Sequence, residues 1–212
     1  MHLLIIGATS GIGARTRETA LSRGHLVRAM ARSAEKLEAS DRLEPFQGDA
    51  TAAADVVRAL EGGIDAVIVT LGIRERLAML WEEERLFSDA TRVVLQAMET
   101  SDVSRLIVIT GFGAGRSRAA MSTLESIGHK AVLGRPYADK DRQEALILES
   151  PLNWTIVRPV ILTNNKGTGK YRILRDPNDW RNGLISRADV ADYLVKAAED
   201  GLDIRSDVVL AR

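Results

Sequence analysis

The stretch His2-Leu3-Leu4-Ile5-Ile6-Gly7-Ala8-Thr9-Ser10-Gly11-Ile12-Gly13 decides the fold of this 212-residue chain. A run of strand-forming apolar residues passes into a glycine-rich turn, and residues 11–23 then follow a helical period. Glycine allows positive φ and lets backbone N–H groups approach a ligand, while a helix N-terminus adds a partial positive charge. A strand, a glycine turn and a helix in this order predict a βαβ unit whose turn binds a diphosphate, although an ordinary glycine-rich turn is the alternative.

Apolar strand-like runs alternate with helical stretches along the rest of the chain, as is typical of a parallel sheet buried on both faces. The predicted strands are His2 to Ile6, Leu26 to Ala31, Glu44 to Gln47, Ala66 to Thr70, Leu106 to Thr110, Trp154 to Val157 and Val208 to Ala211. The predicted helices span residues 11–23, 52–60, 84–100, 138–149 and 187–199. We therefore expect an α/β fold, a Rossmann-type doubly wound parallel sheet in three αβα layers.

The length and the 45% hydrophobic content suit a single nucleotide-binding domain over residues 1–212. No internal repeat or linker interrupts the pattern, but two long segments after strands lack it, residues 111–136 and 160–184. In open α/β sheets ligands bind beyond the carboxyl ends of the strands. We therefore expect these two loops to line a substrate pocket.

Composition excludes several kinds of partner. Lys and Arg together equal Asp and Glu together at 29 each, so no net field favours nucleic acid or an anionic membrane. The apolar run Leu3 to Ile6 has no cationic leader and is too short for a signal peptide or a spanning helix, which predicts a cytoplasmic protein. We expect a monomer or a homodimer. The absence of Cys and the three scattered His predict no metal site.

The residues after the second predicted strand bear on cofactor choice. Arg32 and Ser33 stand there, with Lys36 a turn later, where an NAD-specific site would usually present Asp or Glu to the ribose hydroxyls. A guanidinium binds the 2′-phosphate of NADP by paired hydrogen bonds, and a hydroxyl adds another. The sequence therefore favours NADP over NAD, with a solvated surface arginine as the alternative.

Two further segments follow predicted strands and face the same ligand. Asp49-Ala50 closes the third strand, where the carboxylate could accept from the adenine amino group or could cap the following helix. Leu71-Gly72 follows the fourth strand and is expected near the adenine ribose and the diphosphate, with Arg74 just beyond. Arg74 could equally be a solvated side chain.

Several short motifs are distributed over nearly the whole chain. They are Gly-Ala-Thr-x-x-x-Gly from Gly7, Arg105-Leu-Ile-Val-Ile-Thr-Gly111, Tyr137-Ala-Asp-Lys140 with Glu144, and Trp154-Thr-Ile-Val-Arg-Pro159. Together they resemble the atypical short-chain dehydrogenase/reductase superfamily, and Val69-Thr-Leu-Gly-Ile-Arg74 and Gly169-Lys-Tyr171 are similar to biliverdin-IXβ/flavin reductase and its bacterial relatives. The resemblance implies hydride transfer from NADPH to a small planar acceptor such as a flavin, a quinone or a linear tetrapyrrole.

The resemblance also implies roles for side chains. Lys140 would bind the nicotinamide ribose and lower the phenol pKa, Tyr137 would donate a proton, and Thr110 would polarise the acceptor. This chain departs from the family because Tyr137 stands three residues before the lysine instead of four, and the family serine corresponds to Thr110 or is lost at Gly111. Proline at 136 suits a helix start, which would put Tyr137 and Lys140 on one face. Lys140 as a solvated lysine and Tyr137 as a rim aromatic are the alternatives.

Together these interpretations predict a cofactor site and three hypotheses for function. The predicted cofactor contacts are Gly7, Thr9, Ser10, Gly11, Ile12, Gly13, Arg32, Ser33, Lys36, Asp49, Ala50, Leu71, Gly72, Arg74, Thr110 and Lys140, and by resemblance Pro159, Val160 and Ile161. The leading hypothesis is an NADPH-dependent oxidoreductase. The second is a catalytically weak NADP(H)-binding redox sensor. The third is a sugar-nucleotide epimerase or dehydratase, which ranks lowest because little chain follows the sixth strand to build a large substrate domain.

Overall fold

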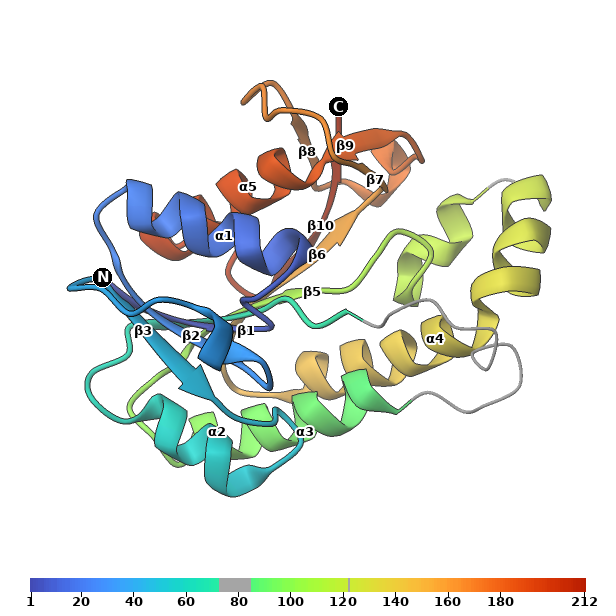
Figure 1. Ribbon diagram of the computed structural model, residues 1–212. Helices are drawn as coiled ribbons and strands as arrows, with labels where there is room; N and C mark the ends of the chain where they lie inside the picture. Colours follow the sequence, from blue (N-terminus) through green and yellow to red (C-terminus); the bar gives the residue numbers. More distant parts are fainter. Residues whose placement is uncertain (73–84, 122) are drawn as a thin grey trace.

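Helices and strands alternate along the chain in a computed structural model, which describes the backbone of residues 1–72, 85–121 and 123–212 and the side chains of these residues outside 123–135 (Figure 1). The elements are β1 (His2–Ile6), α1 (Gly11–Ser22), β2 (Leu26–Ala31), β3 (Leu43–Gln47), α2 (Ala53–Leu60), β4 (Ala66–Val69), α3 (Leu86–Glu99), β5 (Arg105–Ile109), α4 (Thr123–Glu149), β6 (Asn153–Pro159), β7 (Ile161–Thr163), β8 (Arg172–Leu174), β9 (Leu184–Ser186), α5 (Arg187–Glu199) and β10 (Ser206–Ala211). Short 3₁₀ helices lie at Ala34–Lys36, Gly115–Ala120 and Pro177–Asp179.

The main sheet has the strand order β3-β2-β1-β4-β5-β6-β10-β8. Neighbouring strands are parallel except β8, which pairs antiparallel with β10 at the edge. The chain runs outward from β1 in one direction to β3, and then returns to β4 on the other side of β1. This reversal places a ligand crevice at the carboxyl ends of β1 and β4.

Each face of the sheet has its own core. Leu3 and Ile5 of β1 pack on the side that contains α1 and α5, whereas Leu4 and Ile6 pack on the side that contains α2, α3 and α4. Figure 1 shows the two helical layers on opposite sides of the strands. Burial on both faces explains why the central strands β1, β4 and β5 carry continuous apolar runs instead of an alternating pattern. The predicted doubly wound αβα fold is confirmed.

The segment after β5 differs from the predicted loop over residues 111–136. Gly115–Ala120 forms a 3₁₀ helix, and α4 begins at Thr123 and contains Pro136 in its interior. The prediction that a helix starts near Pro136 is therefore wrong. A proline removes one backbone hydrogen bond, and a helix continues through it where packing fixes both sides. Beyond the proline, the buried Asp139 carboxylate accepts hydrogen bonds from the backbone N–H groups of Phe87 (2.8 Å) and Ser88 (3.4 Å), which anchors α4 to the start of α3.

The segment predicted as a loop over 160–184 also contains regular structure. The strands β7 and β8 lie within it, and β7 pairs in parallel with β9 just beyond it. The turn between β7 and β8 is fixed by the Asp189 carboxylate, which accepts from the N–H groups of Thr168 (2.7 Å) and Gly169 (2.8 Å). Strands of three residues are too short to show a period in the sequence. The prediction that residues 160–184 lack regular structure is therefore wrong.

Candidate functional site

The glycine turn after β1 is shaped by contacts that leave no room for side chains. A Cβ atom at Gly13 would lie 2.1 Å from the carbonyl oxygen of Gly7, and one at Gly7, whose φ is +90°, would lie 2.9 Å from the carbonyl oxygen of Thr70. At Gly11, which has φ +56° and begins α1, the Cβ position has no described atom within 4 Å. Within the described residues no side chain caps α1, because Ser10 makes no capping hydrogen bond. Among the described residues no side chain therefore accepts from the N–H groups at the start of the helix, which fits a diphosphate.

The end of β2 lies against this turn. The hydroxyls of Thr9 and Ser33 are 3.2 Å apart, which joins two of the predicted contacts. Arg32 is exposed, and in the described part of the chain its guanidinium forms no hydrogen bond or ion pair. Lys36, also exposed, ends the nearby 3₁₀ helix. The glycine turn and the segment after β2 thus carry two hydroxyl groups in contact and two exposed cations.

Asp49 does not cap α2, contrary to one of its two interpretations. The helix begins at Ala53 with Ala52 as its N-cap, and the Asp49 carboxylate instead accepts from the N–H (2.9 Å) and the hydroxyl (2.8 Å) of Thr51. These two hydrogen bonds lower the pKa of Asp49, and Arg32 adds a smaller effect in the same direction. The adenine contact of Asp49 stays a prediction.

The neighbouring predicted contacts differ in exposure. Ala50 is buried, Leu71 is half-buried and Gly72 is exposed. Arg74 lies outside the described residues.

Lys140 and Tyr137 of α4 lie together at the carboxyl end of β5. The Lys140 ammonium donates to the backbone carbonyl of Thr110, and it lies 4.7 Å from the ring centre of Phe87 and 5.7 Å from that of Tyr137. Burial lowers the pKa of Lys140 to about 8, and the Glu144 carboxylate partly opposes that shift. Burial, followed by the charge of Glu144, raises the pKa of Tyr137 to about 12. The phenol therefore holds its proton at neutral pH.

The hydroxyl of Thr110 belongs to a different set of contacts. It donates to Glu144 Oε1 at 2.7 Å, and Thr110 is buried. A hydroxyl has one proton, so this bond uses the proton with which Thr110 would polarise an acceptor. That role of Thr110 stays a prediction. The next residue, Gly111, carries no hydroxyl at all.

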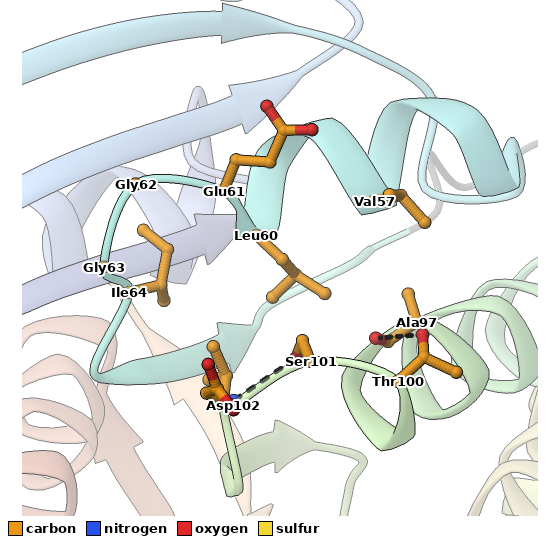
Figure 2. A pocket seen from close by; sticks show the side chains of 11 residues that line it. Val57, Leu60, Glu61, Gly62, Gly63, Ile64, Ala97, Thr100, Ser101 and Asp102 are labelled. Carbon is orange, nitrogen blue, oxygen red and sulfur yellow. Dashed lines mark hydrogen bonds between the residues drawn. The ribbon is translucent and has the colours of Figure 1, made fainter.

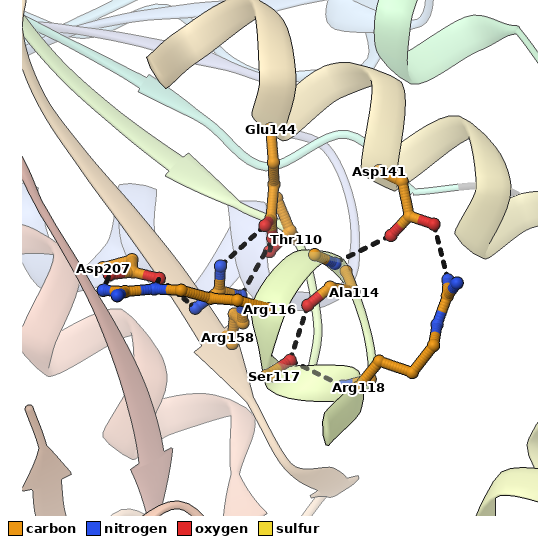
Figure 3. A network of polar contacts seen from close by, with 11 residues as sticks. Thr110, Ala114, Arg116, Ser117, Arg118, Asp141, Glu144, Arg158 and Asp207 are labelled. Atoms are coloured by element: carbon orange, nitrogen blue, oxygen red, sulfur yellow. Dashed lines mark hydrogen bonds and ion pairs between the residues drawn. The ribbon is translucent and has the colours of Figure 1, made fainter. Parts of the chain in front are cut away.

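A buried ionic network centred on Arg158 lies beneath these residues (Figure 3). Arg158 Nε and Nη2 donate to the Glu144 carboxylate at 2.9 and 2.6 Å, and its Nη1 donates to Asp207. Arg116 also binds Asp207, and both guanidiniums lie about 5 Å from the ring centre of Trp180. Burial is the largest single effect and lowers the pKa of Arg158, but the hydrogen bonds and charges of Glu144 and Asp207 together outweigh it and raise that pKa.

The network joins four elements, α4, β6, β10 and the 3₁₀ helix Gly115–Ala120. Sequence reasoning did not find it, although one signal was present. Arg158 and Asp207 are charged residues in the largely apolar strands β6 and β10, and charged residues in a strand buried on both faces must be paired.

The predicted nicotinamide contacts continue from β6. Pro159 and Val160 are buried, and the side chain of Ile161 is exposed. The Val160 N–H donates to the carbonyl of Leu210 (3.1 Å), and the Phe112 N–H donates to that of Pro159 (3.1 Å). The segments after the carboxyl ends of β1, β2, β3, β4, β5 and β6 therefore carry the described site residues predicted at strand ends along one edge of the sheet.

A cavity of about 350 Å³ opens at the opposite edge, between the carboxyl ends of α2 and α3 (Figure 2). Leu60, Ile64, Thr100 and Val103 are among the residues that line it. It contains none of the predicted site residues. Across the described ranges, no group of His, Asp and Glu is arranged to hold a metal ion, and no helix is long and apolar enough to cross a bilayer.

Comparisons with known proteins agree with this geometry. A family model described as NAD(P)H-binding matches residues 7–201. An uncharacterized sugar epimerase of Bacillus subtilis strain 168, YhfK, is 28% identical over 206 residues, which cover 94% of this chain and 89% of the relative. An uncharacterized chloroplastic protein of Arabidopsis thaliana is 27% identical over 203 residues, covering 92% of this chain and 71% of the relative.

Among solved structures, an anaerobillin reductase from Escherichia coli O157:H7, ChuY, superposes with a TM-score of 0.82 at 29% identity, over 100% of this chain and 97% of that chain. The family match and this neighbour confirm the resemblance to atypical short-chain dehydrogenases/reductases. This chain belongs to the NAD(P)H-binding family of Rossmann-fold proteins.

Proposed function

We propose that this protein is an NADPH-dependent oxidoreductase that transfers a hydride to a small planar acceptor, such as a flavin, a quinone or a linear tetrapyrrole. The observation that carries the proposal is the cluster at the end of β5. There the Lys140 ammonium lies beside the Tyr137 phenol and is fixed by the Thr110 carbonyl, on the same sheet edge as the glycine turn. A cation and a protonated hydroxyl at that edge can orient a ribose and supply a proton.

The residues present fit the cofactor. The open turn at Gly11 accommodates a diphosphate, and Arg32, Ser33 and Lys36 accommodate a 2′-phosphate. NADPH, when bound, supplies the hydride. Lys140 would bind the nicotinamide ribose, Val160 and Ile161 would line the nicotinamide pocket, and Tyr137 would donate the proton that accompanies the hydride to the acceptor.

The preference for NADP is tested at Arg32. Arg32→Ala is expected to weaken NADPH binding by roughly 10- to 100-fold, because a hydrogen bond to a charged group is worth about 1.5–3 kcal/mol. NADH lacks the 2′-phosphate, so its affinity should change less than twofold. Titrations of both nucleotides measure the two dissociation constants. Arg42→Ala is the matched control, since Arg42 is exposed and stands at the opposite end of the sheet, before β3.

Equal losses for NADPH and NADH in Arg32→Ala would show that Arg32 does not recognise the 2′-phosphate. A wild-type preference for NADH would have the same meaning.

The pH dependence of turnover follows from Lys140. Its pKa is lowered to about 8 by burial, so the ammonium loses its proton as pH rises through that value. We expect kcat to fall as pH rises through about 8, while the tyrosine, with a pKa near 12, stays protonated. A pH–rate profile from pH 6 to pH 10 measures this decrease in kcat. Lys140→Arg keeps the charge across this range, and its profile should be flat there; a limb near pH 8 that persists in Lys140→Arg would rule Lys140 out as its source.

Loss of the Lys140 proton also affects stability. The unfolded state binds more protons than the folded state between the lowered pKa and the ordinary lysine value, so the free energy of unfolding should rise with pH in that window. Activity and stability are therefore expected to move in opposite directions above pH 8.

The choice of acceptor rests on the relatives and on the segments that follow β5 and β6. The E. coli neighbour is described as an anaerobillin reductase, which favours a tetrapyrrole-like or similarly planar acceptor. We propose that residues 111–136 and 160–184 line the pocket for it. The test is oxidation of NADPH by the purified protein with FMN, a quinone and a linear tetrapyrrole in turn. Turnover with one of them supports the proposal, and tight NADPH binding without turnover across the panel contradicts it.

Two other functions each have one observation in their favour. The B. subtilis relative is named a sugar epimerase, and an epimerase would form product with no net consumption of NADPH. The sequestered hydroxyl of Thr110 favours a weakly catalytic NADP(H)-binding sensor, which would bind NADPH and not turn it over. The acceptor panel and analysis of a nucleotide-sugar mixture for redox-neutral products separate the three.

A further inference from the structure

The phenol of Tyr137 lies directly against the backbone of Gly111. A Cβ atom built at Gly111 would lie 2.7 Å from the Tyr137 hydroxyl oxygen and 3.3 Å from Cζ. The first distance is shorter than any that a side-chain carbon tolerates, so a residue larger than glycine and the phenol cannot both keep these positions. We propose that Gly111 is a positioning residue, whose missing side chain provides the seat for the Tyr137 hydroxyl at the carboxyl end of β5. This inference rests on the proposed reductase function.

The backbone at Gly111 does not itself require glycine. Gly111 is not among the residues with positive φ, so alanine is compatible with its backbone conformation. The space beside it is the constraint. That makes an alanine substitution a test of the contact with Tyr137 and not of local strain.

The backbone at Gly111 is also held on both sides. The Thr110 N–H donates to the carbonyl of Val157 (2.9 Å), the Phe112 N–H donates to that of Pro159 (3.1 Å), and the Gly111 carbonyl accepts from Ala114 (3.0 Å). Phe112 is buried in the core. An added side chain at position 111 would therefore displace the tyrosine more readily than the strand end.

The position of the phenol matters because of its neighbours. The Lys140 ammonium, 5.7 Å from the Tyr137 ring centre, binds the carbonyl of Thr110, one residue before Gly111. The Thr110 hydroxyl donates to Glu144, so the proton for the acceptor is assigned to Tyr137. Displacing the phenol would separate the donor from the lysine that accompanies it.

A double-mutant cycle on the full chain tests the seat first by stability. Gly111→Ala, Tyr137→Phe and the double variant are unfolded in urea. The nearest clashing atom is the hydroxyl oxygen, which Tyr137→Phe removes, leaving Cζ at 3.3 Å. Gly111→Ala should therefore lower the unfolding midpoint clearly in the tyrosine background and little in the phenylalanine background. An equal shift of the midpoint in both backgrounds would show that Gly111 does not position the Tyr137 hydroxyl.

The same four proteins test the positioning role through turnover. Tyr137→Phe is expected to lower kcat by roughly 100-fold, as loss of a general acid does, and Gly111→Ala by a similar factor, with the NADPH dissociation constant within twofold of wild type. The double variant should match Tyr137→Phe, because a phenol that is absent cannot be displaced. Losses in kcat that multiply in the double variant overturn the positioning role even if the stability shifts are coupled.

Failure of the proposed function gives a different pattern. Wild-type protein that oxidises no NADPH with any acceptor contradicts the reductase proposal and removes the catalytic role of Gly111. The stability cycle does not depend on turnover, and it decides separately whether Gly111 seats the phenol.

Discussion

Gly13→Ala is expected to weaken NADPH binding by at least about 100-fold, equivalent to roughly 3 kcal/mol. The added Cβ atom would meet the Gly7 carbonyl oxygen at 2.1 Å and the Thr70 hydroxyl at 2.5 Å. The first contact is with backbone, which cannot rotate away as a side chain can. Relief therefore requires α1 to move off β1, which opens the turn that receives the diphosphate. Overpacking of this kind also destabilises a fold by about 1–3 kcal/mol.

Nucleotide titration and urea unfolding of Gly13→Ala measure the two effects. Arg15→Ala is the control in the same helix, since Arg15 is exposed and pairs only with Glu18 among the described residues. An exposed pair of this kind contributes little, so both the affinity and the stability should stay close to wild type. Gly13→Ala with wild-type affinity would show that the glycine turn does not bind the cofactor.

Arg158→Leu is expected to reduce the free energy of unfolding by about 3–5 kcal/mol. Arg158 is 1% exposed, and it neutralises both Glu144 and Asp207. Its removal leaves Glu144 buried without its paired cation, and Asp207 keeps only the more exposed Arg116. The cost comes from uncompensated buried charge, which is larger than the net worth of the pairs themselves.

Urea unfolding measures this loss, and Arg92→Ala provides the comparison. Arg92 pairs with Asp89 at 2.9 Å, but both side chains are largely exposed, so its removal should change stability by less than about 0.5 kcal/mol. Similar small losses in the two variants would mean that the Arg158 network does not hold the end of β6 to α4 and β10.

The parts of the fold that could be predicted are those encoded locally. The apolar residues of β1 and the glycines that follow it specify a strand and a turn within a dozen positions, and the contact of Gly13 with Gly7 spans only six. The position of Arg32 and Ser33 directly after the second strand was predictable for the same reason, since β2 ends at Ala31. Lys140 and Tyr137 were found through the family resemblance, and the structure places them side by side.

The parts that were missed depend on contacts between distant residues. Helix α4 extends back through Pro136 to Thr123, and its anchor to α3 is formed by Asp139 with Phe87 and Ser88, about fifty positions away in the sequence. Neither the proline nor the local pattern carries that information. The pairing of β7 with β9 is likewise a tertiary contact.

The site predicted from the sequence was incomplete for a related reason. Sequence spacing places Thr110 and Gly111 at the carboxyl end of β5, but it does not show that the Thr110 hydroxyl binds Glu144 or that the Tyr137 phenol lies against Gly111. Both contacts depend on how α4 packs across the strand ends.

Hydride transfer itself is tested most directly by isotope. Wild-type protein is incubated with an acceptor that it reduces and with NADPH deuterated at the nicotinamide C4 position, in separate R and S forms, and the reduced acceptor is analysed by mass spectrometry. We expect one of the two forms, and not the other, to deliver deuterium to the acceptor, or to slow the transfer step where the label exchanges with water. If neither form of NADPH transfers its label or slows the reaction, the protein does not move a hydride from NADPH to a planar acceptor, and the proposed function is wrong.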